Sequence, residues 1–300
     1  MNGQKTKEKS PGIVRREAAV PAREPAGSSN KPVVYGVLIC GVLIVVMPLL
    51  WMVSTAFKTM AEITGSGEIN IIPREPTFMA FLSIWKDYPM LTWFKNSSLT
   101  VVFSTVLSIA FSTLAGYGTS RFKFRGRGAL LAFLLVTQMF PSIMMLIPYY
   151  KVLQTIGLIN TLAGLIVVYV SFTIPMLTWM MMGYFEGIPK ELDEAALIDG
   201  CGRFRTFWRI ILPLTLPGLI SAAIYAFIQG WNEYMFALIL MTNDSLKTLP
   251  VGIGQMNGFY RIMWNDLMAA SIVSSIPLLL IFLFLQKYFV SSLTAGAVKQ

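Results

Sequence analysis

The amino-acid sequence predicts an all-α, polytopic membrane protein with six transmembrane helices. Of its 300 residues, 55% are hydrophobic and only 13% are charged, whereas an ordinary soluble domain has about 25% charged residues. The apolar residues gather in runs long enough to cross a bilayer, which needs about 20 residues of helix. The runs are continuously apolar and lack the alternation of membrane β-strands. The predicted spans are Val33–Phe57, Phe94–Thr119, Ala129–Tyr149, Thr161–Phe185, Ile210–Met241 and Leu267–Phe289.

The basic residues predict the topology of these spans. Residues 1–32 and the connection after the second span, with Arg121, Lys123, Arg125 and Arg127, are rich in Lys and Arg. Such residues collect on cytoplasmic loops. The N-terminus, the segment 186–209 and the tail 291–300 are therefore expected in the cytoplasm, and 33–290 form the membrane domain. The placement of basic residues on cytoplasmic segments thus accounts for the net charge of +9, and no nucleic-acid partner is expected.

The N-terminal segment 1–32 is expected to be a disordered cytoplasmic tail. It is polar, charged and interrupted by Pro11, Pro21 and Pro25, so it has too little apolar surface to offset the entropy lost on ordering. A cleaved signal peptide is the alternative interpretation of the first span. The long polar lead and the length of the apolar run favour an uncleaved anchor.

The chain lacks the residues that usually bind metals or hydrolyse ATP. The chain has no histidine and two cysteines, Cys40 and Cys201, so a metal centre is not expected. No phosphate-binding G-x-x-x-x-G-K-[ST] sequence occurs. We therefore expect a protein that is not an enzyme, binds no cofactor and hydrolyses no ATP itself. A membrane enzyme or a channel that works alone is the alternative class.

The segment "KELDEAALIDGCGRFRTFWRIILPL" is the longest charged stretch between two apolar runs. Pro189 and the acidic residues after it favour a helix start, and Gly200 favours its end. Leu192, Ala195, Ala196 and Asp199 share one face of this helix by their spacing. A small, smooth face bordered by acids suits docking into a partner's groove; a solvated helical connector is the alternative.

The motif E-A-A-x3-G-x9-I-x-L-P runs without a gap from Glu194 to Pro213. It resembles the EAA loop of permease subunits in bacterial ATP-binding-cassette (ABC) importers. The stretches "WNEYMFALIL" and "FLQKYFVSSLTAGAVKQ" resemble the MalG-like subunits of the maltose-type, carbohydrate branch. The resemblance implies the MetI-like architecture of type I importers and a place in the bacterial inner membrane.

The same resemblance implies partners and a transport function. The partners would be a second, homologous permease subunit, two copies of a cytoplasmic ABC ATPase that hydrolyses ATP, and an extracytoplasmic solute-binding protein. The function implied is import of a sugar or oligosaccharide, with permeation of a polyol, glycerol phosphate or oligosaccharide lactone as alternatives. The residues implied in ATPase coupling are Glu194, Ala195, Ala196, Asp199, Gly200, Arg203, Ile210, Leu212 and Pro213.

Polar residues within the predicted spans are candidates for the substrate pathway. A sugar site needs a few placed polar groups beside aromatic faces, and a carboxylate within a membrane often faces a watery path. The alternative is that these residues form hydrogen bonds between helices, and the partner permease is expected to supply part of the contacts. The candidates are Gln138, Tyr225, Gln229, Asn232 and Glu233, with Tyr169 and Thr173 as further polar positions.

Two other patterns predict helix packing. Small residues on one face of the second span, including Ser108, Ser112 and Gly116, indicate close contact with another helix. Phe78, Phe81, Leu82 and Trp85 have helical spacing in the segment before that span and predict a helix at the membrane surface.

Overall fold

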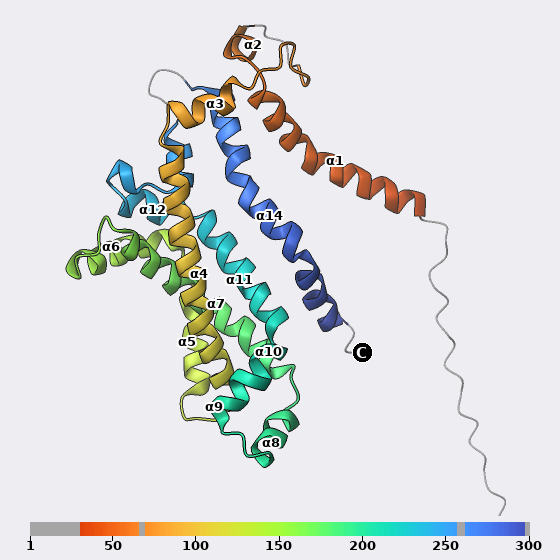
Figure 1. Ribbon diagram of the computed structural model, residues 1–300, viewed down its shortest axis with the longest axis vertical. Coiled ribbons are helices and arrows are strands. Elements are labelled where there is room, and N and C mark those ends of the chain that lie inside the picture. Colours follow the sequence, from red (N-terminus) through yellow and green to blue (C-terminus); the bar gives the residue numbers. More distant parts are fainter. Residues whose placement is uncertain (1–30, 66–69, 257–261, 298–300) are drawn as a thin grey trace, which may run out of the picture. The chain divides into compact units, whose positions relative to one another are not determined.

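The computed structural model describes residues 31–65, 70–256 and 262–297, with side chains up to Gln286 (Figure 1). The predicted disordered tail falls almost entirely on residues 1–30, outside the described residues. Residues 291–297 of the predicted C-terminal tail belong to the last helix, and 298–300 lie outside. The chain divides into two compact units, of which the first ends at Pro48.

Helix α1, Lys31–Ala56, contains this boundary and covers the first predicted span. The second unit, from Leu49, contains the other helical elements. They are α2 Met60–Gly65, α3 Met79–Lys86, α4 Met90–Arg121, α5 Arg127–Met139, η2 Ser142–Met145, α6 Leu146–Thr155, α7 Leu162–Glu186, α8 Glu191–Ile198, α9 Arg203–Thr206, η3 Phe207–Ile211, α10 Leu212–Leu214, α11 Leu216–Trp231, α12 Met235–Leu240, η4 Asp244–Leu246, α13 Leu249–Gln255 and α14 Trp264–Ala297.

The all-α fold class is confirmed, and four of the predicted spans are single helices. In the described part of the chain, α1, α4, α7 and α14 are each long and apolar enough to cross a membrane. The other two predicted spans, 129–149 and 210–241, are broken. The count reaches six only if each of two bent helix pairs forms one span.

The third predicted span bends by 101° between α5 and the η2–α6 segment. The break lies at Phe140, which is extended with φ −76° and ψ 128°. The pyrrolidine ring of a proline disfavours the helical conformation in the residue before it, and Pro141 follows. A proline in the apolar run, not a change in polarity, therefore ends α5.

The fifth predicted span is broken twice. A bend of 74° separates the segment Arg203–Leu214 from α11, because Pro217 in the first turn of α11 cannot continue a helix that comes from before it. The second break follows Trp231, where the chain leaves α11 and starts α12 at Met235. The segment before α11 also contains a turn of π-helix, Phe207–Ile211.

Helices α4 and α7 pack side by side along much of their length. The small face of the second span, predicted from the sequence, forms this seam. The hydroxyl oxygens of Ser108 and Thr173 are 2.7 Å apart across it. A Cβ atom on Gly116 would lie only 2.7 Å from Cβ of Met181, so the two backbones approach as closely as a glycine allows.

Two apolar clusters stabilise the second unit. The first includes Ile84, Met90, Trp93 and Leu165 and draws on α3, α4, α7, α12, α13 and α14. The second includes Leu177, Phe185 and Ile211 and draws on α7, η3 and α11. Along α7 the first cluster ends at Tyr169 and the second begins at Leu177. The stretch of α7 between them is left to face a polar cavity.

The short helix α3 confirms the helix predicted around Phe78–Trp85. Ala80 and Ile84 are buried, while Leu82 and Trp85 are exposed. One face therefore joins the first cluster, and the other leaves large apolar groups at the surface, as expected of a helix at a membrane surface.

Candidate functional site

The charged segment forms α8, which begins and ends where the sequence predicts. Glu191, Asp193 and Glu194 occupy its first turn, where carboxylates complement the positive end of the helix dipole. Its end is a Schellman motif, in which Cys201 N–H donates to Ala196 C=O and Gly200 N–H to Leu197 C=O, at 2.9 and 3.1 Å. Gly200 has φ +78°, a conformation that suits glycine.

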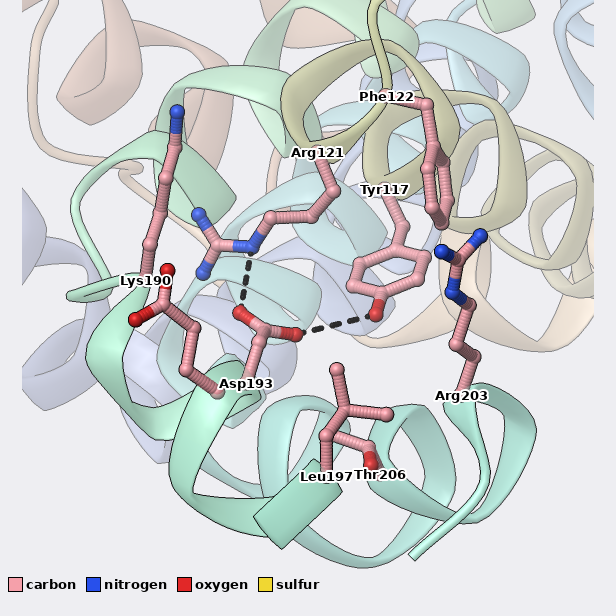
Figure 2. Close-up of a pocket in the computed structure, with 9 residues that line it drawn as sticks. Tyr117, Arg121, Phe122, Lys190, Asp193, Leu197, Arg203 and Thr206 are labelled. Atoms are coloured by element: carbon pink, nitrogen blue, oxygen red, sulfur yellow. Dashed lines mark hydrogen bonds and ion pairs between the residues drawn. The ribbon is translucent and has the colours of Figure 1, made fainter.

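An ion pair fastens α8 to the end of α4 (Figure 2). Arg121 Nε lies 2.9 Å from Asp193 Oδ2, and the two side chains are only 5% and 19% exposed. Tyr117 Oη donates to Asp193 Oδ1 at 3.2 Å. Arg121 Nη2 also donates to the carbonyl of Ile188 at 3.0 Å. The last turn of α4 thus holds both α8 and the chain that leads into it.

Tyr117, Arg121 and Asp193 line a small cavity of about 230 Å³ between α4, α8 and α9 (Figure 2). Glu194 and Leu197 also reach this cavity. The Arg203 guanidinium carbon lies 5.4 Å from the centre of the Phe122 ring, within the range of a cation–π contact. Arg203 therefore attaches the start of α9 to the residue that follows α4.

The predicted ATPase-coupling residues fall into two groups. Glu194, Ala195, Asp199, Gly200, Arg203 and Pro213 are exposed. Ala196 is 3% exposed, so its methyl faces the chain itself and leaves Ala195 as the outward alanine. Ile210 and Leu212 pack against the second apolar cluster. Ile210 and Leu212 hold the segment after α8 against α7. The exposed residues form a surface that a partner can contact.

A second site is a cavity of about 880 Å³ between the two apolar clusters. Its walls come from α5, η2, α6, α7, α11 and α12. All five candidates for the substrate pathway line it, namely Gln138, Tyr225, Gln229, Asn232 and Glu233, and Thr173 does so as well. Tyr169 is instead buried behind the wall, with 1% of its side chain exposed.

Glu233 occupies the break between α11 and α12. Its carboxylate accepts hydrogen bonds from Phe236 N–H at 2.7 Å and Ala237 N–H at 3.0 Å, which caps the first turn of α12. Tyr169 Oη donates to Oε2 at 2.8 Å. The carboxylate thus fixes α12 to α11 and α7 while it lines the cavity.

Aromatic rings supply much of the remaining wall. Phe172 and Phe236 are stacked with an interplanar angle of 15°, and Tyr149 meets Phe236 edge-on. Tyr149 Oη and Ser171 Oγ are 2.6 Å apart. These residues were not among the candidates predicted from the sequence. Tyr149 lies in "MMLIPYY", and only the combination of this tyrosine with the broken third span would have placed it at a cavity.

The sequence and the structure were compared with known proteins. Residues 108–295 match the family described as binding-protein-dependent transport system inner membrane component. The trehalose/maltose transport system permease protein MalG of Thermococcus litoralis is 38% identical over 86% of this chain and 92% of its own. The sulfoquinovosyl glycerol transport system permease protein SmoH of Agrobacterium fabrum is 34% identical over 84% of this chain and 88% of its own.

The solved structure of a bacterial ABC transporter that imports the acidic polysaccharide alginate contains a similar chain. Its TM-score is 0.78 with 23% sequence identity, over 89% of this chain and 99% of that one. This likeness supports the fold.

Proposed function

Because the chain belongs to the family of binding-protein-dependent transport system inner membrane components, we propose that it forms half of the translocation pathway of an ATP-driven sugar importer. The proposed partners are a second, homologous permease, two copies of an ABC ATPase and an extracytoplasmic protein that delivers the solute. The chain itself is a membrane transport subunit, not an enzyme, and it needs no bound cofactor.

The observation that carries the sugar assignment is the cavity of about 880 Å³ lined by amides, hydroxyls and aromatic rings. Sugars are recognised by a few placed hydrogen-bonding groups beside flat apolar faces. Gln229 on α11 and Asn232 directly after it supply exposed amides, and the stacked rings of Phe172 and Phe236 supply part of the aromatic wall. The relative named for trehalose/maltose transport agrees with a sugar as the solute.

The proposed coupling element is α8. Its exposed surface, with Glu194 and Ala195, is suited to a groove of the ATPase that has basic or polar groups. The ion pair between Arg121 and Asp193 joins α8 to α4, so a displacement of α8 would reach α4 directly. We propose that ATPase closure moves α8 and the end of α4 together, and that α9, η3 and α10 carry the same motion to α11.

The proposed orientation places both termini and α8 in the cytoplasm. It is supported by the basic residues of the N-terminal segment and by the four basic residues at 121–127, which follow the usual positive-inside distribution. The α3 end of α4 would then face the extracytoplasmic side, where the solute is delivered.

Transport would proceed by alternating access. A loaded binding protein and bound ATP would each favour one state of the cavity through their different affinities for the two states. The stacked rings and polar groups of the cavity would be exposed to one side of the membrane at a time. A channel, in contrast, would need neither partner.

Affinity purification from native membranes followed by reconstitution tests this proposal. We expect the tagged chain to retain a second permease and an ATPase, and we expect the binding protein with its solute to stimulate ATP hydrolysis. Accumulation of solute in vesicles should require ATP. A chain that purifies alone and passes solute down its gradient without ATP would contradict the proposal.

A further inference from the structure

We infer that the cavity selects uncharged sugars, with Glu233 as the group that repels anionic ones. This inference rests on the proposed function and concerns only the charge of the solute. It excludes uronates and the phosphorylated alternatives, such as glycerol phosphate, that the sequence left open.

The charge of the cavity wall carries the inference. Its lining comprises 20 residues of which Glu233 is the only ionisable acid or base apart from tyrosines, in the part of the chain that the structure describes. An anion that enters a low-dielectric site needs a cation or several donors there to replace its hydration. The described lining includes neither Lys nor Arg, so the chain offers such a solute no opposite charge.

The hydrogen bonds of Glu233 bring no positive charge to the cavity wall. Its three partners are Tyr169 Oη and the N–H groups of Phe236 and Ala237. All three are neutral donors, so none of them offsets the charge of the carboxylate. A second anion in the cavity would therefore meet a repulsion that is strong where water is partly excluded.

The same wall suits an uncharged, hydroxyl-rich solute. Gln138, Gln229 and Asn232 each have an exposed side chain at the cavity, and amides both donate to and accept from hydroxyls. A carboxylate has about four acceptor positions, of which three are occupied. Glu233 can therefore accept one sugar hydroxyl while it keeps its structural bonds.

Charged thiol reagents measure this selectivity without knowledge of the solute. A Gln229→Cys variant places one thiol a helical turn before Glu233, in the assembled transporter with Cys40→Ala and Cys201→Ser. The probes are methanethiosulfonates with a neutral, a trimethylammonium and a sulfonate group. We expect the ratio of cationic to anionic labelling rates to exceed that of a free thiol by about tenfold, and Glu233→Gln to remove most of this excess.

Two controls make the result decisive. A thiol at the exposed Thr64, outside the cavity lining, should show a ratio that Glu233→Gln leaves unchanged. Gln138→Lys, which adds a cation to the wall and keeps the Glu233 bonds, should lower the ratio by about tenfold even if Glu233→Gln fails to assemble. If the ratio of cationic to anionic labelling rates at position 229 equals that of a free thiol, and neither variant alters it, the inference is wrong while the proposed function still stands. Failure of all three reagents to react would contradict a watery cavity, and with it the proposed function.

Discussion

Asp193 attaches α8 to the end of α4 through its ion pair with Arg121. The sequence predicts it as one of three acids in the first turn of a helix, and that position is confirmed. Its ion pair with Arg121 was not predicted, because the partner belongs to a different helix and was interpreted only as a topological charge. Helical spacing predicts neighbours within an element; contacts between elements depend on packing that one sequence does not encode locally.

Replacing Asp193 by asparagine tests the link between α8 and α4. The change keeps the size of the side chain and leaves the guanidinium of Arg121, whose side chain is 5% exposed, without its anion. We expect a loss of about 1–3 kcal/mol of stability, the cost of a buried polar group left without its partner, seen as a lower unfolding temperature of the solubilised transporter, and less transport per ATP hydrolysed. Glu191→Gln, at an exposed acid of the same helix, is the control.

The Asp193 prediction has a second readout. If the two side chains act as a pair, Arg121→Gln should add little damage to Asp193→Asn, because interacting residues give non-additive effects. Additive losses, or an Asp193→Asn variant that behaves as Glu191→Gln does, would show that the ion pair has no part in holding α8.

Gly200 gives a matched test of the α8 end. It has φ +78° and no heavy atom within 4 Å of a Cβ built on it, so an alanine there meets only conformational strain of about 1 kcal/mol. We expect Gly200→Ala to weaken retention of the ATPase on an affinity resin. Gly202 has equally open surroundings and an ordinary φ of −65°. Equal retention in Gly200→Ala and Gly202→Ala would contradict the proposed coupling role of this helix end.

At the scale of elements, the apolar runs predict where helices lie but not where they break. The runs over 129–149 and 210–241 are apolar overall despite a few polar residues, and hydrophobicity alone gave no reason to divide them. Pro141 and Pro217 mark two of the breaks, but Pro48, Pro175 and Pro277 lie inside unbroken helices. Proline chemistry therefore favours a break without deciding which apolar run has one. At the third break, the Glu233 carboxylate caps the first turn of α12 and also accepts from Tyr169 on α7, a contact between elements that spacing along the chain does not predict.

The seam between α4 and α7 was predictable, since small residues on one face indicate close packing. Its tightest point is Gly116, where a Cβ would lie 2.7 Å from Met181 Cβ and 2.9 Å from Met182 N. We expect Gly116→Ala to force the helices apart and lower stability by about 1–3 kcal/mol, measured by unfolding in detergent. Gly118→Ala, on the same helix with nothing within 4 Å, should be neutral or slightly stabilising.

At the scale of the second unit, two apolar clusters lie on either side of a polar cavity along α7. The sequence predicted the five cavity residues as separate candidates on the third and fifth spans. Their meeting at one cavity follows from the breaks in those spans, which turn α6 and α12 around the stretch of α7 between the clusters. The aromatic part of the wall was missed for the same reason.

The cavity and the coupling helix make one prediction about the assembled transporter. If access alternates, a thiol at Gln229→Cys should react with an impermeant reagent from opposite sides in different states. With a non-hydrolysable ATP analogue and the binding protein present, we expect extracytoplasmic labelling to rise and cytoplasmic labelling to fall, each by about tenfold or more, because each ligand favours one state by its differential affinity. The background again contains Cys40→Ala and Cys201→Ser.

A Thr64→Cys thiol, in the exposed part of α2, should label from the extracytoplasmic side in both states and so report the orientation of the chain. Asp193→Asn should leave the resting pattern of Gln229→Cys in place but reduce its response to nucleotide, because α8 would no longer draw α4 with it. Labelling of Gln229→Cys from both sides at once, unaffected by nucleotide, would identify a channel instead. The nucleotide response therefore links the small ion pair at the end of α4 to the cavity between the two clusters.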